Sequence, residues 1–165
     1  SQWGIALSLV PAILVVVGPD MDGNPWNVGP AAREFASQHG FGDSVRFVGS
    51  MRDPIPALHA ADICVQPSHF EAQGRSVVEA LATGLPVAAC AVGGLLDFMK
   101  DRHNGVLCPP KDPQALAKAL QPLLEDAVLR QRLAAAARSS IAQDYDEAVV
   151  FGRCADLLRR LAEAR

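Results

Sequence analysis

The sequence predicts an α/β fold: a Rossmann-like parallel sheet with helices on both faces and a helical C-terminal tail. Short apolar runs rich in β-branched residues alternate with segments of helical periodicity, which is the pattern of βαβ units. The runs show no polar alternation, as in strands that are buried on both faces. The length of 165 residues suits one domain, so we expect residues 1–165 to form a single Rossmann-like domain.

The apolar runs predict strands at residues 13–17, 45–48, 62–66, 86–90 and 106–108. Helical periodicity and capping signals predict helices at residues 31–39, 54–60, 75–83, 95–99, 113–124, 127–143 and 147–164, after a partial helical stripe in residues 1–9. Ligands of such sheets bind beyond the carboxyl ends of the strands. We therefore expect the functional residues in the loops 18–29, 49–53, 67–74 and 91–94.

Composition excludes several classes of function. The net charge is −3, without the basic stripe of a general nucleic-acid binder. The four cysteines form no CxxC pair, which favours buried thiols in a reducing cytoplasm over disulfides or zinc. The histidines show no metal-ligand spacing, and no apolar run reaches the roughly 18 residues of a membrane span. We expect a cytoplasmic protein without a metal.

The stretch from Pro67 to Pro86 is the one that predicts a binding site. A short loop follows a strand and leads into a helix, with Glu71 in the loop and Glu79 in the helix. Helix phase predicts a buried face and a polar face. The buried face holds Val77, Val78, Leu81, Ala82 and Leu85, and the polar face holds Ser76, Glu79 and Thr83.

The start of this helix suits an anion, because its first backbone N–H groups and its dipole favour negative charge. Gly74 allows close approach of the backbone to a ligand, and Arg75 adds positive charge. From spacing alone the two glutamates stay ambiguous. A glutamate on a polar helix face is commonly only solvated, and one near a helix start commonly complements the dipole.

The segment from Glu71 to Val87, EAQGRSVVEALATGLPV, resembles the acid-seven-acid signature of group 1 (family four) retaining glycosyltransferases, which have the GT-B fold of two Rossmann-like domains. Further segments resemble the same family in order, from about residue 12 to 145. They are Val15 to Gly18, Val45 to Gly49, Ala61 to Ser68, Val92 to Gly94, Asn104 to Pro110 and Asp112 to Ala117.

The resemblance implies that the chain is the C-terminal, donor-binding domain of an enzyme that moves a hexose-type sugar from a nucleotide sugar to an acceptor hydroxyl. It implies that Glu79 binds the donor ribose and that Glu71, the catalytic residue, contacts the donor sugar and stabilises charge near its anomeric carbon. The other implied donor contacts are the backbone N–H groups of Gly74, Arg75 and Ser76 at the diphosphate, Met51 at the base, and Gly18 near the nucleotide. No metal or other cofactor is implied.

Two positions depart from the family pattern: Gln73 stands where an aromatic residue is common, and Asp97 where a glutamate is usual. The resemblance also places the acceptor-binding N-terminal domain, and a first strand with its basic residues, outside these 165 residues. We therefore expect the chain alone to be inactive, with its acceptor unknown. We expect the helix in residues 145–165 to pack toward the absent domain, or to pair with a second copy in the isolated chain. Membrane association of the full-length parent stays open.

Alternative functions remain at this point. One is a GT-B sugar-nucleotide epimerase or a glycogen-synthase-like polymerase, against which the acid-seven-acid stretch favours the transferase. Another is a non-catalytic flavodoxin-like binding module, although Asp20 and Asp22 have no matching lysine. The pair Gly93-Gly94 allows either a ligand approach or a tight turn before a helix, and the family likeness favours the ligand.

Overall fold

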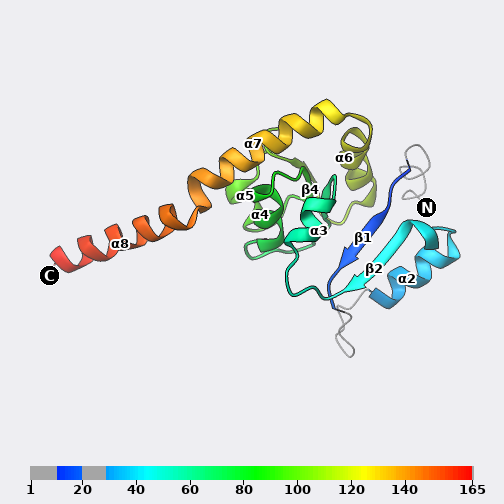
Figure 1. Ribbon diagram of the computed structural model, residues 1–165, viewed down its shortest axis with the longest axis horizontal. Helices are drawn as coiled ribbons and strands as arrows, with labels where there is room; N and C mark the ends of the chain where they lie inside the picture. Colours follow the sequence, from blue (N-terminus) through cyan, green and yellow to red (C-terminus); the bar gives the residue numbers. More distant parts are fainter. Residues whose placement is uncertain (1–10, 20–28, 165) are drawn as a thin grey trace. The chain divides into compact units, whose positions relative to one another are not determined.

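The computed structural model describes residues 11–19 and 29–164 (Figure 1). The chain divides into two compact units, Ser1–Pro54 and Ile55–Arg165. The helical stripe predicted for residues 1–9 lies outside the described residues, as does most of the loop 18–29 with Asp20 and Asp22.

The Ser1–Pro54 unit holds a two-stranded parallel sheet. Its elements are β1 (Leu14–Val17), α2 (Gly29–Gln38), the 3-10 turn η1 (Gly42–Ser44) and β2 (Val45–Gly49). The register runs from Leu14 opposite Val45 to Val17 opposite Gly49. The helix α2 contributes the Arg33 guanidinium, 4.1 Å from the centroid of the Phe47 ring. The expected burial of the first strand is wrong: Val15 is 50% exposed, because in the described part of this unit only α2 is available to cover the sheet.

The Ile55–Arg165 unit holds a three-stranded parallel sheet of order β3-β4-β5. Its strands are β3 (Cys64–Gln66), β4 (Val87–Cys90) and β5 (Val106–Cys108), and its helices are α3 (Ile55–Ala60), α4 (Arg75–Ala82), α5 (Leu95–Phe98), α6 (Pro113–Glu125), α7 (Ala127–Tyr145) and α8 (Glu147–Glu163). The α/β class is confirmed. Each unit has its own parallel ladder, β1-β2 in Ser1–Pro54 and β3-β4-β5 in Ile55–Arg165.

The core of this unit surrounds β4. All four residues of β4 are buried, and because neighbouring side chains point to opposite faces, this strand is covered on both sides. The helices α4, α6 and α7 supply the covering apolar side chains, among them Val77, Leu81, Leu116, Leu120, Leu123, Leu133 and Ile141.

Two positions differ from the predicted buried faces. On α4 most of the predicted face is buried, including Leu81, but Ala82 is exposed and Ala80 is buried in its place. On α7, Val128 was expected in the core and is 74% exposed. It lies in the first turn, and the core contacts of α7 begin only at Leu133.

Capping residues define where the C-terminal helices begin. The Asp112 carboxylate accepts hydrogen bonds from the backbone N–H groups of Gln114 and Ala115, both at 3.0 Å, and Pro113 follows it. This is the predicted start of α6. Asp126 caps α7 and Asp146 caps α8 in the same manner.

Asn104 is the one fully buried polar side chain in the described core. Its Oδ1 accepts from the Lys100 N–H at 2.7 Å, and its Nδ2 donates to the Phe98 carbonyl at 2.7 Å and to Ser140 Oγ at 3.0 Å. The side chain therefore joins the turn before β5 to helix α7.

Helix α8 has an apolar stripe but no buried residue. Phe151 is 64% exposed and Leu158 is 67% exposed. The prediction that this helix packs toward another part of a larger protein stays a prediction. Over the residues that the structure describes, no helix has the combined length and apolarity that crossing a membrane requires.

Candidate functional site

The predicted site lies where β3 passes through residues 67–74 into α4. Gln66 ends β3 and Gly74 precedes α4 as its N-cap. Gly74 has φ 76° and ψ 51°, the left-handed conformation that favours glycine. A Cβ at this position would also collide with the Leu95 side chain. Packing against α5 therefore requires this glycine, in addition to any approach of a ligand.

The first turn of α4 presents free backbone donors. Gly74 has no side chain that could cap the helix. Among the described residues, no backbone or side-chain acceptor takes a hydrogen bond from the N–H of Arg75 or of Ser76. Unpaired N–H groups and the helix dipole make this end suitable for an anion.

Glu71 is held by a polar network that joins the strand, the loop and the helix. Its Oε1 accepts hydrogen bonds from Gln66 Nε2 and, at 2.8 Å, from Ser68 Oγ. Gln66 Nε2 also donates to Ser68 Oγ at 2.9 Å, and Ser76 Oγ donates to Gln66 Oε1 at 3.4 Å. The carboxylate therefore has a defined direction before any ligand binds.

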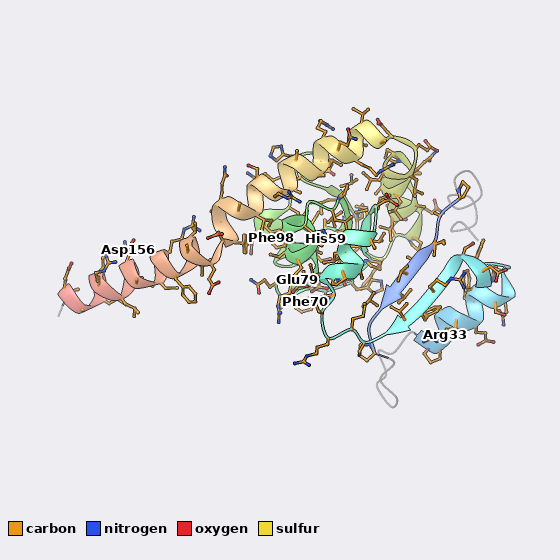
Figure 2. The ribbon with its side chains drawn as sticks, in the orientation of Figure 1. Arg33, His59, Phe70, Glu79, Phe98 and Asp156 are labelled. Carbon is orange, nitrogen blue, oxygen red and sulfur yellow. The ribbon has the colours of Figure 1, made fainter. Side chains whose placement is uncertain are left out.

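Glu79 lies one turn into α4 and outside the core (Figure 2). Its Oε1 is 3.6 Å from Arg75 Nη2, in a pair whose side chains are 34% and 84% exposed respectively. An exposed pair of this kind contributes little to stability. Both side chains can therefore exchange this contact for a ligand without a large cost.

The pair Gly93-Gly94 packs against the Glu71 loop. Gly93 has φ 48°, and a Cβ there would collide with the Glu71 carbonyl oxygen. A Cβ on Gly94 would collide with the Ala72 carbonyl oxygen and lie 3.1 Å from Gln73 Cα. The Gly94 N–H donates to the Glu71 carbonyl at 3.3 Å. The pair forms the turn before α5 that one sequence interpretation expected. Both glycines also give the loop backbone room to approach, a role that the sequence did not predict.

The Ile55–Arg165 unit brings together five of the predicted site residues: Glu71, Gly74, Arg75, Ser76 and Glu79. The other two belong to the Ser1–Pro54 unit. Gly18 follows β1 and donates its N–H to the Gly49 carbonyl at 2.9 Å, while Met51 follows β2 and is 41% exposed. The roles of all seven at a donor stay predictions.

Sequence reasoning missed Gln66 and Ser68. Gln66 was treated as the end of a strand, because nothing in its neighbours indicates a contact with a residue five positions later. Its place as the last residue of a strand that leads to Glu71 was the signal available.

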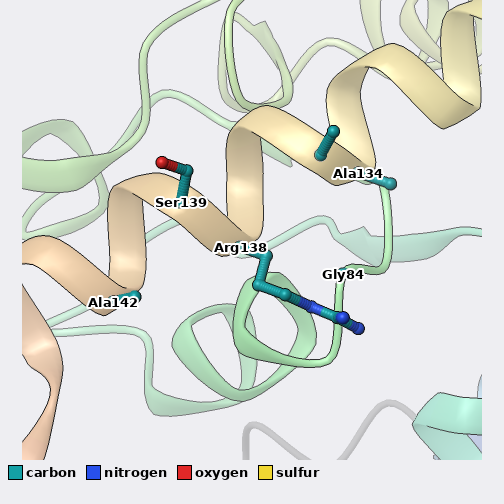
Figure 3. A pocket seen from close by; sticks show the side chains of 6 residues that line it. Gly84, Ala134, Arg138, Ser139 and Ala142 are labelled. Atoms are coloured by element: carbon teal, nitrogen blue, oxygen red, sulfur yellow. The ribbon is translucent and has the colours of Figure 1, made fainter.

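A separate shallow hollow of about 460 Å³ lies between Gly84 and helix α7 (Figure 3). Arg138 lines it and donates from Nη2 to the Thr83 carbonyl at 2.8 Å. This contact ties α7 to the end of α4. The hollow includes none of the residues of the Glu71 network.

The cysteines behave mostly as small core residues. Cys90 and Cys108 are buried, Cys64 is half-buried and Cys154 is exposed. Burial raises the pKa of Cys64 to about 11 and is the main cause that raises the pKa of Cys108 to about 12. No set of three or more His, Cys, Asp or Glu side chains is placed to hold a metal ion in residues 11–19 and 29–164. The absence of a metal from the reaction stays a prediction.

Comparison with known proteins supplies a family. A family model described as glycosyl transferases group 1 matches residues 6–140. A glycogen synthase of Mycobacterium tuberculosis is 37% identical over 113 residues, which are 67% of this chain and 27% of that protein. A D-inositol 3-phosphate glycosyltransferase of Salinispora arenicola is 45% identical over 107 residues, covering 64% of this chain and 24% of that protein. The chain thus spans about a quarter of the length of these relatives.

Solved structures agree on the fold. Anabaena HepE in complex with UDP superposes with a TM-score of 0.87 at 26% identity, covering 96% of this chain and 44% of that one. Sucrose-phosphate synthase from Thermosynechococcus elongatus superposes with a TM-score of 0.85 at 30% identity, covering 99% and 42%.

Proposed function

Because this chain belongs to the group 1 glycosyltransferases, we propose that it is the donor-binding part of an enzyme that transfers a sugar from a nucleoside diphosphate sugar to an acceptor hydroxyl. The observation that carries the proposal is the arrangement at the start of α4. An oriented carboxylate at Glu71, unpaired helix N–H groups and a second carboxylate at Glu79 occupy one loop and the first turns of one helix.

The three parts match the three parts of such a donor. The diphosphate binds at the helix start, where free N–H groups and the dipole stabilise the negative charge that grows on it as it leaves. Glu79, about one turn along, accepts hydrogen bonds from the ribose hydroxyls. Glu71 accepts from the donor sugar and stabilises the positive charge that develops at the anomeric carbon. The anomeric configuration is retained and no metal takes part.

The ligands of similar solved structures support a donor that carries uridine diphosphate. The HepE structures contain UDP, and one contains UDP-glucose, at 26% and 27% identity to this chain. UDP-hexoses are therefore the first donors to test.

Calorimetry on the intact protein with UDP, GDP and ADP, and with their glucose or mannose derivatives, tests the donor class. Glu79→Ala removes a charged acceptor, so we expect roughly tenfold weaker binding of the free nucleotide. Glu125→Ala, which removes an exposed carboxylate on α6, is the matched control and should leave the affinity unchanged. Unchanged nucleotide affinity in Glu79→Ala would show that the ribose role is wrong.

Transfer itself is tested with the donor that binds. Glu71→Gln should keep nucleotide affinity and lose most of the transfer rate, since the amide cannot stabilise positive charge. Proton NMR of the product distinguishes a retained from an inverted anomeric centre. The chain of residues 1–165 alone should show no transfer, and normal turnover by it would refute that expectation.

A further inference from the structure

Gln66 occupies the last position of β3 and contacts the carboxylate of Glu71. We propose that Gln66, together with Ser68, is a positioning residue that sets the direction in which Glu71 presents its carboxylate to the donor sugar. This inference rests on the proposed role of Glu71 in donor binding.

The geometry separates the two oxygens of Glu71. Gln66 Nε2 and Ser68 Oγ both donate to Oε1, and no described residue donates to Oε2. An ionised carboxylate accepts hydrogen bonds on both oxygens. Oε2 is therefore the atom left for a hydroxyl of the sugar, and the two donors on Oε1 determine where it points.

Gln66 is itself fixed from two sides. Its backbone lies in the β3–β4 ladder, in register with Ala89. Its Oε1 accepts from Ser76 Oγ at 3.4 Å, which places the amide nitrogen toward Glu71. Since Ser76 also belongs to the helix turn proposed for the diphosphate, the network connects the sugar-binding carboxylate with the diphosphate end of the site.

If Gln66 positions Glu71, its replacement should weaken the binding of UDP-glucose more than the binding of UDP. Gln66→Met keeps the length of the side chain and removes both hydrogen bonds of its amide nitrogen. Binding of UDP should change less than twofold, because UDP carries no sugar at Glu71. The additional affinity of UDP-glucose over UDP should fall about tenfold, as expected for the loss of one or two hydrogen bonds to a charged group.

Two controls accompany this measurement on the intact protein. Gln121→Met removes a similar amide contact, from Gln121 Nε2 to Glu125 Oε1 at 3.1 Å, on the exposed surface of α6, and should alter neither affinity. Ser68→Ala should lower the additional affinity of UDP-glucose over UDP, called here the UDP-glucose increment, and Ser68→Thr should restore it. An unchanged increment in Gln66→Met, or an equal loss of UDP and UDP-glucose affinity, would overturn the proposal.

Gln66→Glu adds a second measurement, the pH dependence of the additional affinity of UDP-glucose over UDP. A contact with a structural role only would leave this pH dependence unchanged. The new carboxyl meets Glu71 and can donate to it only while protonated, so the UDP-glucose increment should be near normal at pH 5 and lost at pH 8. The other titratable side chains of this loop and helix are His69, Arg75 and Glu79, which this substitution leaves in place. Gln121→Glu should show no such pH dependence.

A ligand-free measurement separates this inference from the proposed function. In Gln66→Glu the shared proton raises the pKa of the carboxyl pair above its unfolded value, so the melting temperature should fall between pH 5 and pH 8 relative to Gln66→Met. Adding Glu71→Gln should abolish that fall. If it persists in the double variant, Gln66 does not act on Glu71 and the proposal is wrong. If it is abolished while the unmodified protein binds no nucleotide, the contact stands and the proposed function fails.

Discussion

Gly94→Ala is a sharp test of how the site loop is held. Gly94 has φ −66° and ψ −8°, a helical conformation that alanine adopts without strain. By backbone propensity alone, alanine should stabilise the protein by about 0.4–1 kcal/mol. The added Cβ would collide with the Ala72 carbonyl oxygen and lie 3.1 Å from Gln73 Cα. Both contacts are with backbone, so the loop that carries Glu71 must move.

Overpacking of this kind costs about 1–3 kcal/mol, which exceeds the gain from the backbone. We therefore expect a net loss of stability of roughly 1–2 kcal/mol, measured as a lower urea midpoint at an unchanged slope. Displacement of Glu71 by about 1 Å should also lower the transfer rate by on the order of 100-fold.

The matched control is Gly152→Ala, within the helix α8, where a Cβ meets nothing within 4 Å. This variant should be neutral or slightly more stable, with an unchanged transfer rate. If Gly94→Ala behaves like Gly152→Ala in both assays, the close packing of the loop on Gly94 is not what holds Glu71.

Four further predictions concern the scaffold. Asn104→Ala should lower the free energy of unfolding by about 2–4 kcal/mol, because it removes three hydrogen bonds and takes the amide donor away from the carbonyl of buried Phe98; urea unfolding measures this. At pH 8 an alkylating reagent should modify exposed Cys154 first, and Cys64 and Cys108 only on unfolding. The raised pKa values of Cys64 and Cys108, about 11 and 12, keep both thiols protonated at that pH. Mass spectrometry of the labelled peptides shows the order in which the cysteines react. Since unfolded thiols ionise near pH 8.5–9, stability should fall as pH rises from there toward 11. Asp112→Ala removes the cap of α6 and should cost about 1 kcal/mol, seen as a lower melting temperature.

Local rules were sufficient for most elements of the fold. Strand β4 was evident from its continuous apolar run, and the start of α6 from the Asp112-Pro113 pair, because both signals depend on neighbouring residues. One position on the buried face of α4 was wrong, because Ala80 is buried in place of Ala82. Phase within a helix depends on what packs against it, and α7, which packs on α4, comes from residues far along the chain.

The same distinction applies to the site. The sequence by itself determined the acid spacing, the helix that follows Gly74, and the family to which these motifs belong. The tertiary structure decided how Glu71 is oriented, since Gln66, Ser76 and the Gly93-Gly94 turn meet the loop only when β3, α4 and the segment after β4 fold together. Those contacts depend on close approach of backbones and on the direction of one amide group, and neither property is encoded in residue spacing along the chain.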